Sequence, residues 1–301
     1  MNLLINRKPV EGPWGGGNLF VKAFHRYMAS CGHSVRETLT GDLDFIFVQD
    51  PRPAAGQINF DDIISFKKQH PNVKIVHRVN ECDARKATTG VDDFLRRCSN
   101  YTDHTIFVSN WMQAYHIERG WNCESRSVLY NGVDLQHFKK CPKIVNGKTN
   151  IVTHHWSDNP LKGADVYEFL DNFVGENPNF TFTYIGRTKQ QFKNAKVVPP
   201  LSGADLGAHL ARYDIYISGT RFDPGPNHII ESLACELPTF TFSEGGGACE
   251  FVGEKHIFHD TTSLVDALQN YKSVGANVGV KPHSWETCMK NLADTLQRVR
   301  S

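Results

Sequence analysis

The sequence predicts an α/β protein with two Rossmann-like domains, and three observations lead to this prediction. The chain has 301 residues, which is more than one compact core usually serves. Apolar runs typical of strands alternate with segments of helical apolar spacing, a pattern typical of a parallel sheet with crossover helices. The alternation is interrupted once, by the polar segment 137–150, which we interpret as an interdomain linker. We expect the two domains to face each other across a cleft, where ligands of such sheets bind.

The first domain is expected over residues 1–143. A glycine-rich loop at 12–18 follows its first strand, and the apolar spacing after Leu19 predicts a helix that ends at Gly32. The predicted strands of this domain are 3–5, 45–49, 73–79, 104–109 and 127–133, with helical segments around 63–66 and 94–95.

The second domain is expected over residues 144–284 and repeats the alternation. Leu292, Leu296 and Val299 then recur at helical spacing and predict a terminal helix. The predicted strands of the second domain are 151–156, 180–186, 196–198, 214–218 and 238–242, and its predicted helices are 163–174, 204–212 and 263–272.

The composition is that of an ordinary globular protein, with 40% hydrophobic and 22% charged residues. The formal net charge of +1 argues against a nucleic-acid-binding protein that relies on bulk electrostatics. A local basic cleft for a small anion remains compatible with this charge.

The cysteines and the apolar runs indicate the compartment. Eight cysteines are spread along the chain without a CxxC pair or a zinc-like Cys/His spacing, so we expect free thiols in a reducing compartment. The N-terminal apolar run is too short for a signal peptide, and no stretch approaches the roughly 18 apolar residues of a membrane span. These features predict a cytoplasmic protein, with peripheral association with a membrane left open.

The stretch RFDPGPNHIIESLACELPTF (221–240) places two carboxylates around a turn. Asp223 precedes Glu231 by eight residues. Pro224 and Pro226 keep the intervening backbone out of a helix, and Gly225 lets it approach a ligand closely. One alternative is a ligand site, and the other is a turn aspartate followed by a solvated helical glutamate.

The residues after this turn are expected to begin a helix. Asn227 is a good N-cap, and the free amides of Asn227, His228 and Ile229 would then point at an anion. Glu231 would lie one turn into the helix, where its carboxylate can accept hydrogen bonds from two ribose hydroxyls. The stretch is therefore a candidate nucleotide site.

Four segments carry a family resemblance, and they occur in the family's order. They are GPWGGGNLFVKAFHRYMASCGHSV (12–35), the residues from TIFVSNW to NGVDLQHF (105–138), HHWSDNPLKGADV (154–166) and DPGPNHIIESLACELPTFTFSEGGGACEFV (223–252). Over nearly its whole length the chain resembles the retaining GT-B glycosyltransferases of glycosyltransferase family 4. The resemblance implies the GT-B fold and a terminal helix, 285–301, that returns to the first domain.

The resemblance also implies a donor site for a nucleotide-diphosphate sugar. It implies that Glu231 binds the ribose and that Lys162 binds the diphosphate. It places Asp223 near the transferred sugar, at a position where the family has glutamate. The family's usual arginine position holds Ser157, and Arg221 or Arg187 would compensate. The expected donor-binding residues are Gly16, Gly17, Ser157, Lys162, Arg187, Gly225, Pro226, Asn227, His228, Ile229 and Glu231.

The segment VHRVNECDARK (76–86) follows a predicted strand and is rich in polar groups. The resemblance matches His77 to a histidine that contacts the donor sugar, so His77, Asp223 and Lys162 are the expected catalytic residues. Trp14, Arg78 and Asn80 are candidates for sugar or acceptor contacts. The alternative for this segment is an ordinary loop with one core histidine.

The expected reaction is that of a hexosyl-type glycosyltransferase with retention of configuration and no metal or other cofactor. The pair Asp42 and Asp44 matches a metal-binding DxD, but it opens a strand, so no metal role is expected. The expected partners are a UDP- or GDP-linked sugar and a carbohydrate, lipid or protein-linked glycan acceptor, without nucleic acid. The alternatives are a non-catalytic nucleotide-sugar binder, a GT-B sugar-nucleotide epimerase or a phosphorylase.

Overall fold

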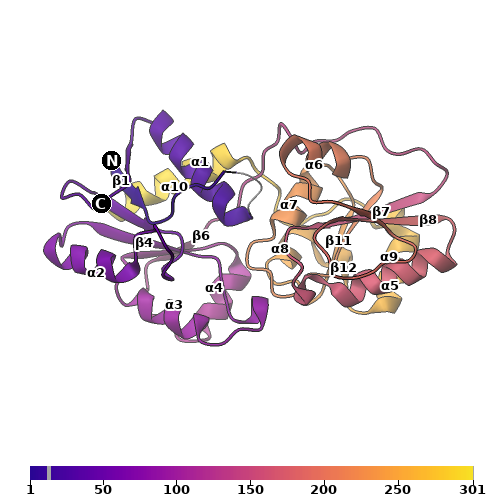
Figure 1. Ribbon diagram of the computed structural model, residues 1–301, viewed down its shortest axis with the longest axis horizontal. Coiled ribbons are helices and arrows are strands. Elements are labelled where there is room, and N and C mark those ends of the chain that lie inside the picture. Colours follow the sequence, from indigo (N-terminus) through magenta and orange to yellow (C-terminus); the bar gives the residue numbers. More distant parts are fainter. Residues whose placement is uncertain (12–14, 301) are drawn as a thin grey trace. The chain divides into compact units, whose positions relative to one another are not determined.

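The computed structural model describes residues 1–11 and 15–300, which form two compact units (Figure 1). The first contains Met1–Gly132 and the C-terminal helix, and the second contains Val133–Ser284. The first unit ends eleven residues before residue 143, where the boundary was predicted. The amide of Val133 donates to the carbonyl of His283 at 2.9 Å, and that of Ile144 donates to the carbonyl of Arg212 at 2.8 Å. The predicted linker region is therefore held by hydrogen bonds within the second unit.

The first unit is built on a six-stranded parallel sheet in the order β2-β1-β3-β4-β5-β6. The strands are apolar because helices cover both faces, as parallel sheets require. The strands are β1 (Asn2–Ile5), β2 (Ser34–Arg36), β3 (Phe45–Val48), β4 (Lys74–Val79), β5 (His104–Phe107) and β6 (Arg126–Val128), and the helices are α1 (Gly16–Ser30), α2 (Phe60–Gln69), α3 (Val91–Ser99), α4 (Asn110–Ile117) and α10 (Trp285–Arg300).

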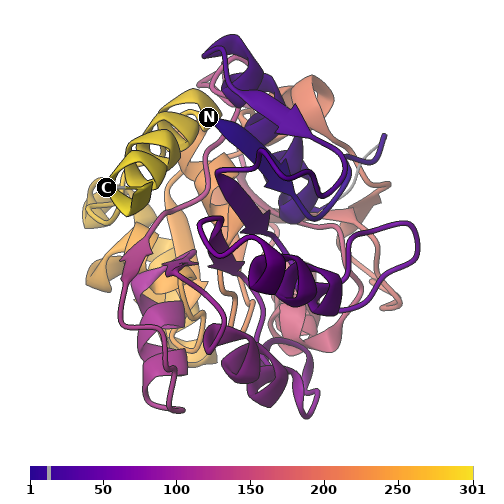
Figure 2. The same cartoon turned by 90° about the vertical axis from the view of Figure 1, so that its left-hand side faces the viewer.

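Helix α10 returns to the first unit and packs beside α1 on one face of this sheet (Figures 1 and 2). Trp285 and Leu292 of α10 are buried in one cluster with Phe20 and Phe24 of α1 and with strand residues such as Phe47. Arg300 also binds Asp44 at 2.8 Å. The opposite face is covered by α2, α3 and α4, whose buried residues form separate clusters with the strands.

The second unit repeats this plan, with a parallel sheet in the order β12-β11-β10-β7-β8-β9. Its main core packs Tyr167 and Leu170 of α5 and Leu264 of α9 against Ile151, Phe182 and other strand residues. The strands are β7 (Thr149–His155), β8 (Phe180–Gly186), β9 (Lys196–Val198), β10 (Ile215–Ser218), β11 (Thr239–Phe242) and β12 (Ile257–Phe258), and the helices are α5 (Ala164–Glu176), α6 (Gly203–Leu210), α7 (Asn227–Ala234), α8 (Ala248–Val252) and α9 (Thr261–Val274).

The structure confirms the predicted fold class, with two parallel α/β units in one chain. Most predicted strands differ from the observed ones by one or two residues at an end. The strand predicted over 127–133 is shorter in the structure and spans Arg126–Val128. The Leu129 amide donates the last hydrogen bond between β6 and β5, to the carbonyl of Phe107. Val133 instead forms an isolated bridge with Ser284 in the second unit. The short strand β12 was not predicted, since two apolar residues carry too little periodicity.

Candidate functional site

Polar side chains gather in the second unit at the carboxyl ends of β7 and β10 and at the start of α7. Strand β7 ends with His154 and His155, Asp223 follows β10, and Glu231 lies on α7. The carboxyl ends of neighbouring parallel strands meet at one edge of a sheet, where ligands of such folds bind. This edge therefore carries the part of the predicted donor site that lies in the second unit, whereas Gly16 and Gly17 lie in the first unit.

Lys162 and Asp223 form an ion pair at this edge. The Lys162 Nζ lies 2.6 Å from Asp223 Oδ2, and the two side chains are 18% and 6% exposed. Lys162 ends the short 3-10 helix η2 (Pro160–Lys162), whose first turn is capped by the Asn159 side chain at 2.9 Å. Because both partners are largely desolvated, this pair has a stronger attraction than an exposed pair of the same length.

A close approach of two glycines fixes the position of Lys162. Gly163 has a φ of 102°, and a β-carbon on it would lie 2.6 Å from the backbone of Gly219, just after β10. The amide of Arg221 also donates to the carbonyl of Leu161 at 2.8 Å. The segment after β7 is thus held directly against the segment after β10, which brings Lys162 to Asp223.

The backbone around Asp223 is strained and tied to the loop after β11. Phe222 has a φ of 53°, which is costly for a bulky residue. Asp223 forms an isolated parallel bridge with Gly246, because its amide donates to Gly245 at 3.2 Å and its carbonyl accepts from Gly247 at 2.9 Å. These contacts hold the Asp223 carboxylate in one orientation toward Lys162.

Glu231 pairs with a histidine that the sequence analysis did not select. His154 Nε2 lies 2.8 Å from Glu231 Oε2, and the two side chains are 9% and 14% exposed. The only sequence signal for this partner was its place at the end of the strand IVTHHW. Glu231 is therefore neither solvated nor isolated, and one of its oxygens is already oriented by His154.

Two further histidines lie beneath this edge as neutral groups. Burial lowers the pKa of His228 to about 3, although the nearby Asp223 carboxylate raises it, and burial lowers the pKa of His155 well below its usual value. Ser218 Oγ lies 2.9 Å from His228 Nε2, and the His155 ring hydrogen-bonds to the Tyr167 hydroxyl. These histidines form a satisfied polar layer and carry no charge at neutral pH.

The start of helix α7 differs from the prediction. Its N-cap is Pro226, and Asn227 is the first helical residue, so the prediction that Asn227 caps the helix is wrong. The amide of Asn227 donates to Gly225 at 3.0 Å, and that of Ile229 donates to Pro226 at 3.0 Å. The Pro-Gly-Pro turn folds back on the helix and uses these two amides itself, so they do not point freely at an anion.

The two predicted compensating arginines lie in different surroundings. Arg221 binds Asp165 through two bonds of 2.7 and 2.8 Å, lies 3.3 Å from Glu244 and stacks on Phe242, and these carboxylates raise its pKa. Arg187 is exposed, and its guanidinium lies 4.3 Å from the ring centroid of Trp156. Arg187 is thus the arginine that remains available for a ligand.

Ser157 is exposed between β7 and η2, and its hydroxyl accepts a bond from the Asn159 amide at 3.3 Å. It lies in the segment that leads from Trp156 to Lys162. Gly225 lies in the turn before α7, where its amide faces Asp223 Oδ1 at 3.3 Å. The second unit therefore brings Lys162, Asp223 and the turn before α7 together by direct contacts.

The first unit has its own polar edge, on which Arg78 is buried. Its guanidinium donates to Gln49 at 3.3 Å and to Asn131, and it stacks on Phe20 at 4.1 Å. Within the described residues it makes no ion pair with a carboxylate, and its Nε has no partner. Burial lowers the pKa of Arg78 to about 10, so the side chain stays charged at neutral pH.

The described end of the predicted glycine loop, residues 15–18, lies near the side chains around this arginine. Gly16 is the first residue of α1. A β-carbon on Gly17 would lie 3.3 Å from the side-chain nitrogen Nε2 of Gln49 and 3.8 Å from the side-chain nitrogen Nδ2 of Asn80. Gly17 therefore lies close to Asn80 and to the Gln49 side chain, which accepts a hydrogen bond from Arg78. Trp14, which was also predicted here, lies outside the described residues.

His77 lies on the other side of β4 from Arg78. It is 1% exposed, and its ring centroid lies 5.9 Å from that of Trp121. Burial lowers the pKa of His77 to about 3, since the neighbouring Asp50 offsets only part of the desolvation. We therefore assign no catalytic step to His77, and its contact with a donor sugar stays a prediction.

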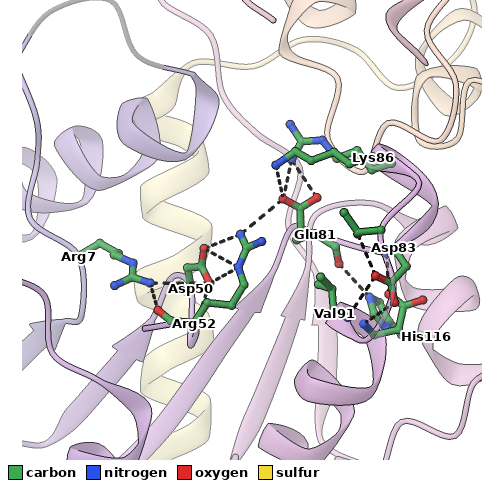
Figure 3. A network of polar contacts seen from close by, with 11 residues as sticks. Arg7, Asp50, Arg52, Glu81, Asp83, Lys86, Val91 and His116 are labelled. Carbon is green, nitrogen blue, oxygen red and sulfur yellow. Dashed lines mark hydrogen bonds and ion pairs between the residues drawn. The ribbon is translucent and has the colours of Figure 1, made fainter. Parts of the chain in front are cut away.

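A network of ion pairs follows β3 and β4 (Figure 3). Glu81 accepts from Arg85 at 3.2 Å and from Lys86 at 3.1 Å, and it lies 3.5 Å from Arg52. Arg52 binds Asp50 at 2.7 Å. The network was not predicted as a unit, because its members come from two strands that are neighbours only in the folded sheet.

No group of residues in 1–11 and 15–300 could hold a metal ion through three or more His, Cys, Asp or Glu side chains. Asp42 binds Arg36 at 2.6 Å, and Asp44 accepts from the amide of Asn2 at 2.8 Å as well as from Arg300. Among the described helices, none combines the length and hydropathy that crossing a membrane would need.

Comparison with known structures defines the class of fold. The chain matches Anabaena HepE in complex with UDP and glucose with a TM-score of 0.72 at 15% identity, over 98% of this chain and 99% of HepE. It matches sucrose-phosphate synthase from Thermosynechococcus elongatus with a TM-score of 0.71 at 13% identity, over 99% and 98% of the two chains. The protein therefore has the GT-B fold. No protein-family model and no curated protein sequence matches the chain.

Proposed function

We propose that the protein is a glycosyltransferase that transfers a sugar from a nucleotide-diphosphate sugar to an acceptor. The observation that carries this proposal is the pair of contacts at the carboxyl edge of the second sheet, Lys162 with Asp223 and His154 with Glu231, in a GT-B fold. Solved structures of the same fold include HepE complexes with UDP and with UDP-glucose, which favours a UDP-sugar over a GDP-sugar as donor.

Glu231 would bind the ribose of the donor. A carboxylate accepts several hydrogen bonds, and His154 occupies only one of its oxygens at 2.8 Å. The second oxygen can accept from the two vicinal ribose hydroxyls. His154 then acts as a positioning residue, because it sets the rotamer of Glu231 without touching the ligand.

Lys162 would bind the diphosphate. Its ammonium has three donors, of which the Asp223 bond uses one, so it can contact a phosphate oxygen while it still holds Asp223. The departing diphosphate gains negative charge in the transition state, and a desolvated cation stabilises that charge strongly. Arg187 is the second cation that can reach a phosphate, since Arg221 is committed to Asp165 and Glu244.

Asp223 would bind the transferred sugar through its hydroxyls. Its pairing with Lys162 stabilises the carboxylate as an acceptor and disfavours a nucleophilic role. Transfer with retention would then proceed on the front face of the sugar: the bond from the anomeric carbon to the diphosphate breaks, the acceptor oxygen bonds to that carbon, and the acceptor proton passes to the leaving phosphate. Lys162 and Arg187 would supply the charge that a metal supplies elsewhere.

A second candidate function is a non-catalytic nucleotide-sugar binder. Two observations favour it. Ser157 stands where the resembling family has an arginine, so one positive charge is missing. The charges of Lys162 and Asp223 already neutralise each other. Both functions predict nucleotide binding, and only the transferase predicts nucleotide release.

The test is a thermal-shift screen with UDP, GDP, UDP-glucose and GDP-mannose, followed by an assay of nucleotide release with pooled acceptors. A ligand bound only by the folded state raises the melting temperature. Binding with release supports the transferase, and binding without release supports the non-catalytic binder. A screen in which no nucleotide or nucleotide sugar shifts the melting temperature contradicts both functions.

A further inference from the structure

A pocket of about 260 Å³ lies in the first unit, at the carboxyl ends of β1 and β2. The residues that follow β1 form one wall, and Arg36 and Glu37 at the end of β2 form another. His25 of α1 and the loop 56–58 complete the lining. The pocket contains none of the residues assigned to the donor, so it has no role in the proposed function as described above.

Three buried nitrogen atoms around this pocket have no hydrogen-bond partner in the part of the chain that the structure describes. They are Arg7 Nη1, His25 Nε2 and Arg36 Nε, and all three residues line the pocket. A buried polar group without a partner is costly, and three at one pocket exceed what an ordinary interior tolerates. All three nitrogens are shielded from solvent, so an acceptor atom of a ligand reaches each one only after its side chain turns toward the pocket.

The lining also has more positive than negative charge. It contains the cations Arg7, Lys8 and Arg36, and one carboxylate, Glu37. Lys8 and Glu37 are 3.5 Å apart but 57% and 73% exposed, so their pair contributes little.

The other two cations have acidic partners outside the lining. Arg7 lies 3.8 Å from Asp50, which binds Arg52 more closely at 2.7 Å (Figure 3). Arg36 binds Asp42 at 2.6 Å through one terminal nitrogen, which leaves its Nε unused. Both guanidiniums therefore keep donors that an anion can take.

We propose that this pocket binds the phosphate group of a small ligand. Two guanidiniums and an imidazole line the pocket from three different segments of the chain. A tetrahedral phosphate offers acceptors in several directions, whereas a planar carboxylate matches a single guanidinium. The volume is slightly below the range of about 300 to 1,000 Å³ usual for ligand pockets, which fits a phosphate on a small body. If the proposed transferase function holds, on which this last step rests, the ligand is a phosphorylated acceptor.

The test uses inorganic phosphate as the probe, with sodium chloride at equal ionic strength as the reference. We expect phosphate to raise the melting temperature and to shift the ring resonances of His25, which are assigned with a His25→Gln variant. Arg36→Gln should weaken phosphate binding about tenfold, as expected for the loss of a charge-assisted contact. Arg7→Gln should have the same effect and provides a second reading if Arg36→Gln folds poorly.

The matched control is Arg26→Gln, because Arg26 is an exposed arginine next to His25 that does not line the pocket. It should bind phosphate as the wild type does. The proposal is overturned if phosphate leaves the His25 resonances unchanged, or if Arg36→Gln and Arg7→Gln both bind phosphate as tightly as Arg26→Gln. A parallel titration with UDP separates the two proposals. Phosphate binding without UDP binding contradicts only the proposed transferase function. UDP binding without phosphate binding at this pocket contradicts only the proposed phosphate site.

Discussion

The polar edges of the two sheets differ in how their charges are matched. In the second unit each site carboxylate has one close basic partner, with Lys162 bound to Asp223 and His154 bound to Glu231. In the first unit Arg78 is buried without a carboxylate, and the pocket at the ends of β1 and β2 has three cations and one acid. The same parallel-sheet plan thus carries a paired site in one unit, and in the other it carries buried cationic side chains with nitrogen atoms that have no partner among the described residues.

This difference shows which contacts a ligand would have to supply. At the second edge the protein groups orient one another, so the proposed donor would enter a site that is already arranged. At the first edge several donors have no acceptor, so an anionic ligand would complete the site. The predictions below test whether the paired edge and the edge with unused donors respond differently to substitution.

The largest effect is expected for Lys162→Ala. It removes the cation that is proposed to bind the diphosphate and leaves the buried Asp223 without its Lys162 partner. We therefore expect kcat/KM for nucleotide release to fall about a hundredfold, or roughly 3 kcal/mol. Steady-state kinetics measures this loss. Lys193→Ala, an exposed lysine of the same unit, is the control and should retain activity; equal kinetics in the two variants would contradict the role of Lys162.

Gly163→Ala should destabilise the second unit by about 3 kcal/mol, because it combines a positive φ with a collision against Gly219. Urea denaturation measures the change. Gly90→Ala is the matched control, since Gly90 is also left-handed, with a φ of 86° and a ψ of −7°, and has nothing within 4 Å of an added β-carbon; it should cost only about 1 kcal/mol. Equal losses in the two variants would show that the close approach of η2 to β10 contributes nothing.

Each unit contains a buried histidine that should make stability depend on pH. Burial lowers the pKa of His228 and of His77 to about 3, so unfolding takes up protons at each site below about pH 6.5. Stability should therefore fall as the pH is lowered from 6.5 toward 3, by about 1.4 kcal/mol per pH unit for each histidine.

Urea denaturation at pH 7 and pH 5 measures this slope. His228→Gln and His77→Gln should each flatten it, whereas the exposed His259→Gln should leave it unchanged. If stability depends on pH in both buried-site variants as steeply as in the wild type, these two histidines are protonated in the folded protein.

The smallest change in stability is expected for Arg78→Met. The substitution replaces a buried, unpaired cation by an apolar side chain of similar length, and such replacements are often neutral or stabilising. Urea denaturation should show a change within about 1 kcal/mol. A loss of several kcal/mol would show that the bonds to Gln49 and Asn131 outweigh the cost of burying the charge, and would weaken the contrast between the two edges.

The sequence was sufficient for the fold and for part of the site. Apolar runs and helical spacing predicted most strands to within two residues, because both faces of each parallel sheet are buried. Asp223 and Glu231 were selected from the turn and helix signals of 221–240, and Lys162 was selected through the family resemblance. The structure brings Lys162 and Asp223 into contact. Turn and helix signals, together with the resemblance, therefore carried much of the information about this edge.

Other features depend on contacts between distant segments. His154 binds a residue 77 positions away, and its place at the end of β7, which His155 shares, did not distinguish it from a core histidine. The N-cap of α7 was assigned to Asn227 by residue preference, but the preceding turn uses that amide. The burial of His77 and the unpaired charge of Arg78 depend on which face of β4 each residue occupies and on what packs there.

The most direct test of the proposed donor site is calorimetric titration of UDP into Glu231→Ala beside the wild type and Glu168→Ala, an exposed acid of α5. The proposed site predicts that wild type and Glu168→Ala bind UDP with equal affinity and that Glu231→Ala binds it at least tenfold more weakly, while all three melt at similar temperatures. Equal UDP affinity in Glu231→Ala and Glu168→Ala, or no UDP binding by the wild type, would contradict it.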